Sequence, residues 1–183
     1  MADKMHYLSN EEHLKIILTQ DQIVTKIGEL GKIISNDYQG KELVLIGVLR
    51  GSVYFLVDLT RSMSIPFAMD FISVSHYGEQ AEKTGVVRIT KDLDLTISDK
   101  HVLIVEDIVD TGLSLGYLLR NLKTRNPASL KVCTLLNVEA RRIVNVPVDY
   151  KGFDMPNIFV VGYGLDYNEK YRNIQFIAEL KHQ

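Results

Sequence analysis

The feature that most constrains the fold is a set of short apolar runs spaced along the chain. The longest run, Leu43–Leu49, is bounded by Gly40 and by Arg50-Gly51. Similar runs lie at 67–75, 86–90, 102–105, 131–136 and 158–161. The runs 43–49 and 102–105 stay apolar throughout, which is typical of strands buried on both faces.

Helical patterns separate these runs. Ile23, Ile27, Leu30 and Ile34 recur at spacings of four, three and four, and Thr19 with Gln22 fits a capping box at the start of that helix. Two more helices are predicted, one at 52–63 and one through Leu115, Leu118, Leu119 and Leu122. The alternation predicts an α/β fold with a central, mostly parallel sheet flanked by helices. Ligands of such sheets bind beyond the carboxyl ends of the strands.

Length and charge narrow the class of protein. With 183 residues, 46% of them hydrophobic, the chain is predicted to form one domain with a packed core. The single cysteine, Cys133, cannot form an internal disulfide, which favours a reducing compartment. A net charge of −2 gives no general attraction to nucleic acid or to an anionic membrane. No run approaches the ~18 apolar residues of a membrane span. No signal peptide is recognised either, so a cytoplasmic location is expected.

The segment after the run 102–105 carries most of the chemistry. Glu106, Asp107 and Asp110 place three carboxylates directly after a predicted buried strand, and Thr111, Gly112 and Ser114 lead into the next helix. Carboxylates can bind hydroxyls or a metal ion, and the amides at a helix start suit a phosphate. The combination indicates a sugar-phosphate site. The alternatives are a solvated acidic turn and the Asp-Thr-Gly triplet of aspartic proteases, which belongs in an all-β setting.

Several segments together resemble one family. Val105–Ser114 is similar to the phosphoribosyl-diphosphate signature of type I phosphoribosyltransferases, and the wider chain resembles their hypoxanthine-guanine branch, which serves purine salvage. The resemblance runs from about Ile16 to Leu180. It also covers, in the family's order, the segments 49–52, 75–78, 159–163 and 165–169. It implies transfer of a phosphoribosyl group to hypoxanthine or guanine, with release of pyrophosphate.

The resemblance also implies roles for individual residues. Asp110 matches the proposed general base near purine N7, and Glu106 and Asp107 match the ligands of the ribose hydroxyls. The 5′-phosphate site matches Thr111, Gly112, Leu113 and Ser114. The pyrophosphate site matches Leu49, Arg50, Gly51, Ser75, Tyr77 and Arg172, and family members commonly have a cis peptide between the first two. The purine site matches Val138, Phe159, Val160 and Asp166. The implied cofactor is Mg²⁺, held by Glu106, Asp107 and Asp166.

Two positions depart from the family pattern. Leu113 stands where some members carry a lysine. Val138 stands where the family normally has a lysine that donates to the 6-oxygen of the purine. Loss of such a charge-assisted hydrogen bond costs about 1.5–3 kcal/mol. Three interpretations remain open. Another donor, such as Arg141, Arg142 or a water molecule, reaches the 6-oxygen. Alternatively, the preferred base differs, or the protein is a weak catalyst or a non-catalytic nucleotide-binding regulator.

The resemblance further implies the organisation of the chain and its partners. Residues 1–183 are expected to form a single phosphoribosyltransferase domain, with a hood from about 1–20 and 149–183 and a mobile lid at about 75–90. The expected partners are a purine base, phosphoribosyl diphosphate and further copies of the chain in a homodimer or homotetramer. No nucleic acid and no membrane are expected as partners, in keeping with the sequence pI of 6.2.

Overall fold

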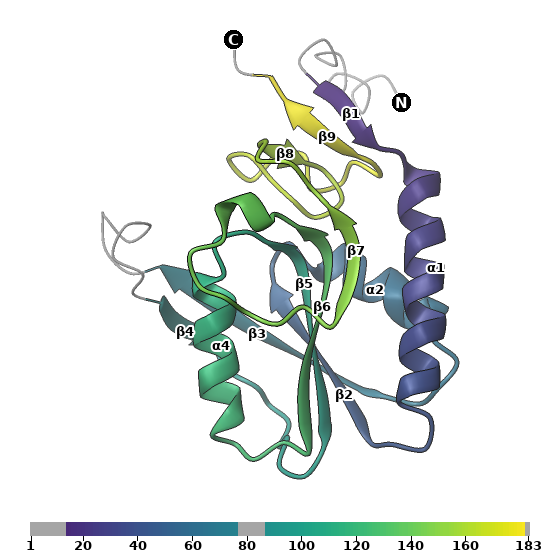
Figure 1. Ribbon diagram of the computed structural model, residues 1–183, viewed down its shortest axis with the longest axis vertical. Coiled ribbons are helices and arrows are strands. Elements are labelled where there is room, and N and C mark those ends of the chain that lie inside the picture. Colours follow the sequence, from purple (N-terminus) through teal and green to yellow (C-terminus); the bar gives the residue numbers. More distant parts are fainter. Residues whose placement is uncertain (1–13, 77–86, 182–183) are drawn as a thin grey trace, which may run out of the picture.

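The computed structural model describes residues 14–76 and 87–181, which form two β-sheets and the helices that pack on them (Figure 1). The larger sheet has six strands in the order β4-β3-β2-β5-β6-β7, and the smaller has the order β1-β9-β8. The elements of the chain in order are β1 (Leu14–Leu18), α1 (Gln20–Asp37), β2 (Leu43–Leu49), α2 (Val53–Ser62), β3 (Ala68–His76), β4 (Val87–Lys91), β5 (His101–Val109), α4 (Leu113–Lys123), β6 (Ser129–Asn137), the 3₁₀ helix η2 (Glu139–Arg141), β7 (Tyr150–Asp154), β8 (Val160–Val161) and β9 (Ile177–Leu180).

The larger sheet confirms the predicted mostly parallel architecture. Strands β3, β2, β5, β6 and β7 run parallel, and β4 pairs antiparallel with β3 at the edge. Successive strand residues point to opposite faces. Leu45, Leu103 and Val105 therefore pack with α1 and α2, whereas Ile46 and Ile104 pack with α4. Because both faces are covered by helices, the strands are apolar throughout, which is the pattern seen in the sequence.

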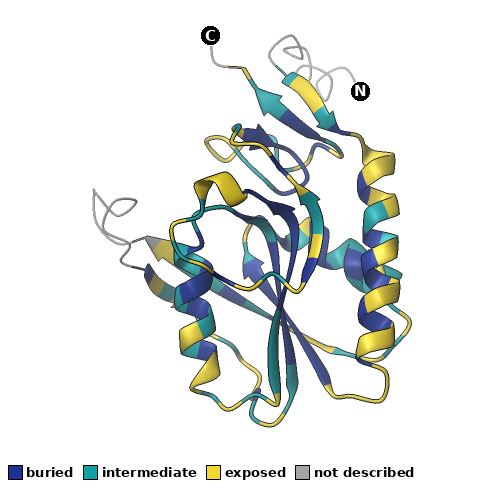
Figure 2. Ribbon diagram, viewed as in Figure 1, coloured by how far each residue is buried: buried dark blue, intermediate teal, exposed yellow. Residues whose placement is uncertain are grey.

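Helix α1 follows its sequence pattern closely. Thr19 and Gln22 form the predicted capping box, with Gln22 N donating to Thr19 Oγ1 at 3.3 Å and Thr19 N donating to Gln22 Oε1 at 2.9 Å. Ile23, Ile27 and the other residues of the predicted stripe are buried, and they form the dark face of α1 in Figure 2. This face packs on α2 and on the larger sheet, whose strands carry the site.

The smaller sheet corrects one prediction. The run 158–161 was predicted to be a core strand of the main sheet, but only Val160–Val161 is a strand, and it pairs antiparallel with β9. Strands β1 and β9 come from opposite ends of the described chain and pair with each other (Figure 1). β1, β9 and β7 were not predicted from the sequence, because each has only four or five residues, too few for a recognisable pattern of buried positions.

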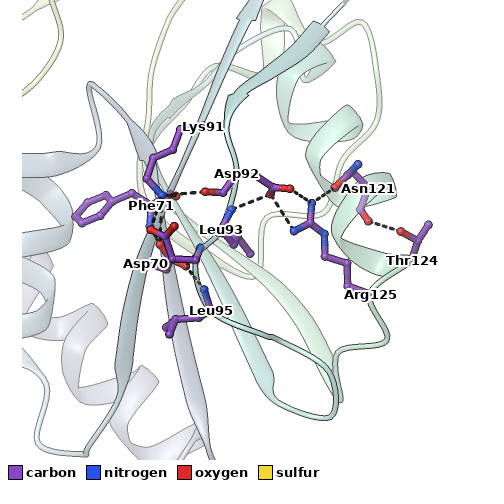
Figure 3. Close-up of polar contacts among 10 residues, drawn as sticks. Asp70, Phe71, Lys91, Asp92, Leu93, Leu95, Asn121, Thr124 and Arg125 are labelled. Carbon is purple, nitrogen blue, oxygen red and sulfur yellow. Dashed lines mark hydrogen bonds and ion pairs between the residues drawn. The ribbon is translucent and has the colours of Figure 1, made fainter.

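A polar cluster fixes the connection between β4 and β5 (Figure 3). The Asp70 carboxylate is 6% exposed and accepts hydrogen bonds from the backbone N–H groups of Phe71, Asp94 and Leu95 at 2.7, 2.8 and 2.8 Å. Burial alone would raise the pKa of Asp70, but these bonds and the nearby Lys91 ammonium outweigh it, so the pKa is lowered.

In residues 14–76 and 87–181, no helix combines the length and the hydropathy needed to span a membrane.

Candidate active site

The predicted site residues meet at one edge of the larger sheet. The carboxyl ends of β2, β5 and β6 lie side by side because these strands are parallel neighbours. Their following loops contain residues 49–52, 110–112 and 138–142. A fourth segment, 162–172, reaches this edge from the smaller sheet, since a side chain on Gly164 would overlap the carbonyl oxygen of Gly51. The tertiary structure thus joins four segments that are far apart in the sequence.

Glu106 and Asp107 lie on opposite faces of β5. Glu106 is 7% exposed and lines a pocket of about 160 Å³ together with Asp110, Thr111 and Ser114. Asp107 faces the loop after β2, where a Cβ atom on Gly51 would overlap Asp107 Oδ2. Only glycine therefore fits at position 51 while Asp107 keeps its place. The two acidic side chains serve two different parts of the site.

Both carboxyl groups have a raised pKa. Burial raises the pKa of Glu106 well above its ordinary value, and the negative charges of Asp107 and Asp110 add to the effect. Burial also raises the pKa of Asp107 to about 6, and the charge of Asp166 contributes. The backbone N–H of Ile108 and the charge of Arg172 lower the pKa of Asp107 but do not offset burial. Enclosed carboxylates of this kind gain from a bound cation or from hydroxyl donors.

The start of α4 offers backbone amides to an anion. Gly112 precedes the helix with a left-handed φ of 79°, and Leu113 N donates a long hydrogen bond of 3.4 Å to Thr111 Oγ1. A Cβ atom at Gly112 would overlap the carbonyl oxygen of Val144, so this turn also requires glycine. The N–H groups of the first turn of a helix have no partner inside the helix and carry a partial positive charge. The segment Thr111–Ser114 is therefore suited to a phosphate.

Two arginines lie on the Asp107 side of the site. Arg50 Nη2 is 2.8 Å from Glu169 Oε1, and the Leu49–Arg50 peptide is cis, as the resemblance implies. Arg172 Nη2 lies 2.8 Å from Asp166 Oδ1 and 3.3 Å from Glu169 Oε2. Sequence reasoning assigned no role to Glu169. Its position in the matched segment 165–169 was the available signal, but the pairing with two arginines depends on the tertiary structure.

The predicted purine residues lie beyond β6 and at β8. Val138 is 2% exposed inside an apolar cluster, and Val160 is 7% exposed. Phe159 is 43% exposed, and its ring meets the ring of Tyr167 edge-on with centroids 5.8 Å apart. An exposed aromatic ring of this kind offers a face on which a purine can stack.

Ser75 and Tyr77 were also predicted to bind pyrophosphate. Ser75 is exposed near the end of β3, opposite Arg88 of β4. Tyr77 lies outside the described residues, as does most of the predicted lid at 75–90.

The acidic residues fit a Mg²⁺ ion shared with a substrate. Among residues 14–76 and 87–181, no three acidic, histidine or cysteine side chains converge as a metal cage. Mg²⁺ is usually bound through one or two carboxylates together with waters and substrate phosphates. Asp107 and Asp166 are close enough for the charge of one to raise the pKa of the other. Their hard oxygen donors suit this ion.

Comparisons with known proteins agree with this geometry. The family described as phosphoribosyl transferase domain matches residues 13–168. Hypoxanthine-guanine phosphoribosyltransferase of Mycobacterium tuberculosis is 51% identical over 171 residues, which cover 90% of this chain and 85% of that protein. The crystal structure of a hypoxanthine phosphoribosyltransferase from Staphylococcus aureus has a TM-score of 0.91 at 42% identity and covers 99% of this chain and 96% of that chain. A mutant hypoxanthine phosphoribosyltransferase from Trypanosoma cruzi, in a ternary substrates complex, has a TM-score of 0.88 at 45% identity and covers 93% and 97%.

Proposed function

The chain belongs to the phosphoribosyltransferase family and is a transferase of purine salvage, and from this premise we propose the reaction and the roles of its residues. The protein joins hypoxanthine or guanine to phosphoribosyl diphosphate and forms IMP or GMP with pyrophosphate. One observation carries the proposal: two carboxylates near the end of β5 and a third directly after it share a sheet edge with the start of α4 and with two arginines. The relatives' names support neither an altered base preference nor a non-catalytic regulator.

The base side of the reaction requires proton removal. Purine N9 forms a bond to C1 of the ribose while the bond from C1 to the pyrophosphate oxygen breaks, and the purine loses the proton on N7. Asp110 accepts that proton. Its Oδ1 accepts a hydrogen bond from Thr111 N, and Arg141 Nη1 lies 3.5 Å from its Oδ2. Phe159 stacks on the purine, and the backbone of Val160 contacts the purine edge.

The phosphate side of the reaction requires positive charge. The segment Thr111–Ser114 binds the 5′-phosphate through backbone amides and hydroxyls. Arg50 and Arg172 bind the diphosphate and, in doing so, exchange Glu169 for phosphate oxygens. A guanidinium can donate two parallel hydrogen bonds to such a group, which orients the leaving group for departure.

Mg²⁺ would supply further charge neutralisation for the leaving pyrophosphate. Asp107 and Asp166 would hold the ion, because Glu106 faces the other side of β5. In this assignment Glu106 binds a ribose hydroxyl beside the 5′-phosphate pocket.

The proposal extends to the organisation of the whole chain. The sheet β1-β9-β8 forms the hood over the site, within one domain of residues 1–183, and residues 75–90 form a lid that keeps water from the ribosyl cation. The protein acts in the cytoplasm as a homodimer or homotetramer. These points rest on the family resemblance.

Pyrophosphate release tests the proposal directly. We expect turnover with hypoxanthine and guanine. Replacing Asp110 with asparagine should lower kcat by about 10²- to 10⁴-fold, because a neutral amide cannot accept the N7 proton. Binding of IMP, measured by calorimetry, should change much less. Asp99→Asn is a matched control, since Asp99 is exposed at a left-handed turn that asparagine tolerates. Turnover with adenine alone, or full activity of Asp110→Asn, would refute the assignment.

A further inference from the structure

Position 138 offers no hydrogen-bond donor to a purine. The Val138 side chain is 2% exposed and packed in an apolar cluster. The backbone N–H of Val138 donates to Val109 O at 2.9 Å, and its carbonyl accepts from Arg141 N at 3.3 Å. A 6-oxopurine placed at this edge of the sheet therefore needs a donor from another residue, since a desolvated oxygen without a partner is costly.

Arg142 is committed to the structure of the loop. Arg142 Nη2 donates to Asn137 Oδ1 at 2.6 Å and lies 3.3 Å from Val109 O. Its Nε is buried and finds no partner within the described part of the chain. If this guanidinium moved to a ligand, Asn137 Oδ1 and Val109 O would both lose their hydrogen bond to Arg142. Arg142 is therefore a poor donor to a substrate.

Arg141 lies close to Asp110 and has enough N–H groups to donate to a ligand bound there. It ends η2, three residues after Val138, and its Nη1 lies 3.5 Å from Asp110 Oδ2. Charge-assisted hydrogen bonds usually measure about 2.7–2.9 Å, so this pair is loose. The two side chains are 46% and 38% exposed, and the guanidinium carries five N–H donors. The group can therefore rotate toward a ligand that covers Asp110.

The 6-oxygen of hypoxanthine or guanine requires a hydrogen-bond donor beside Asp110. In hypoxanthine and guanine, N7 and O6 lie side by side on one edge, and arginine is the side chain that most often reads that edge. If Asp110 meets N7, as the proposed function states, O6 faces the neighbouring guanidinium. We infer that Arg141 is the specificity-determining residue that binds the 6-oxygen of the purine, in the place of a lysine at position 138. Adenine carries an amino group at C6, which would meet Arg141 donor to donor.

A pair of nucleotides that differ in the 6-oxygen, and in the N1 proton that accompanies it, tests this inference. The probes are IMP and purine riboside monophosphate, which has hydrogen in place of the 6-oxygen, each titrated into the full chain by calorimetry. We expect wild type to bind IMP more tightly by about 10- to 100-fold, the range of a charge-assisted hydrogen bond. Arg141→Gln should remove most of that preference and change the affinity for purine riboside monophosphate by less than about twofold. Arg141→Lys should keep part of the preference.

The control is Arg61→Gln. Arg61 also forms an exposed 3.5 Å pair with an aspartate, Asp58, but lies on α2. This variant should keep the full preference for IMP. The inference is overturned if Arg141→Gln binds IMP as wild type does, or if it loses affinity for both nucleotides equally, which would show a positioning effect on Asp110. Binding of neither nucleotide by wild type would instead refute the proposed function, and the inference with it.

Discussion

Replacing Asp107 with asparagine should stabilise the metal-free protein at neutral pH. In the folded protein the pKa of Asp107 is raised from 3.8 to about 6, chiefly by burial. The folded state therefore binds the proton of Asp107 more tightly than the unfolded state between these values, and the contribution of Asp107 to the stability of wild type falls as the pH rises from about 4 to about 6. Asparagine has no charge to desolvate, so the variant escapes this loss.

The expected magnitude follows from the size of the pKa shift. One pKa unit corresponds to about 1.4 kcal/mol, so the shift sets an upper limit of about 3 kcal/mol. Asp107 keeps some contact with solvent, which reduces the penalty, and we expect about 1–3 kcal/mol of added stability above pH 7. Well below pH 4 the carboxyl becomes neutral in both states, so the difference between the two proteins should shrink to about 0.5 kcal/mol at pH 4 and vanish at lower pH.

Urea unfolding at pH 4, 6 and 8 measures this difference. EDTA in every sample removes metal ions that would stabilise the charged carboxylate. Asp99→Asn serves as the control, because it is exposed and its free energy of unfolding should follow wild type at each pH. Our reasoning about burial would be wrong if Asp107→Asn were less stable than wild type at pH 8, or if its advantage were the same at pH 4 and pH 8.

Two further predictions concern packing around the site. Gly51→Ala should lower kcat/KM for phosphoribosyl diphosphate by about 100-fold, because the new methyl group displaces Asp107 or the loop. Gly28→Ala, in open space on α1, should leave kinetics unchanged and add about 0.5–1 kcal/mol of stability; equal kinetics in the two variants would contradict the clash. Tyr163→Phe should lower the free energy of unfolding by about 1.5–3 kcal/mol, because Tyr163 is 6% exposed and donates to Asp58 at 2.6 Å. Unchanged urea unfolding would show that this bond contributes nothing net.

Local patterns predicted the elements that pack on the larger sheet. The stripe from Ile23 to Ile34 lies on the buried face of α1, and the runs at 43–49 and 102–105 are central strands. Periodicity succeeds here because these elements bury one continuous face or both faces. It failed for β1, β7 and β9, which have only four or five residues each, and the pairing of β1 with β9 joins distant parts of the chain.

The candidate site was likewise predicted from the sequence only in part. Residue types and their order along the chain predicted which segments carry the carboxylates, the glycines and the phosphate-binding turn, because that chemistry is local. Three features became visible only in the folded chain: Glu106 and Asp107 face opposite sides of β5, Glu169 pairs with Arg50, and Arg141 lies beside Asp110. Those contacts join residues many positions apart, and they depend on strand register and helix packing, which no local pattern contains.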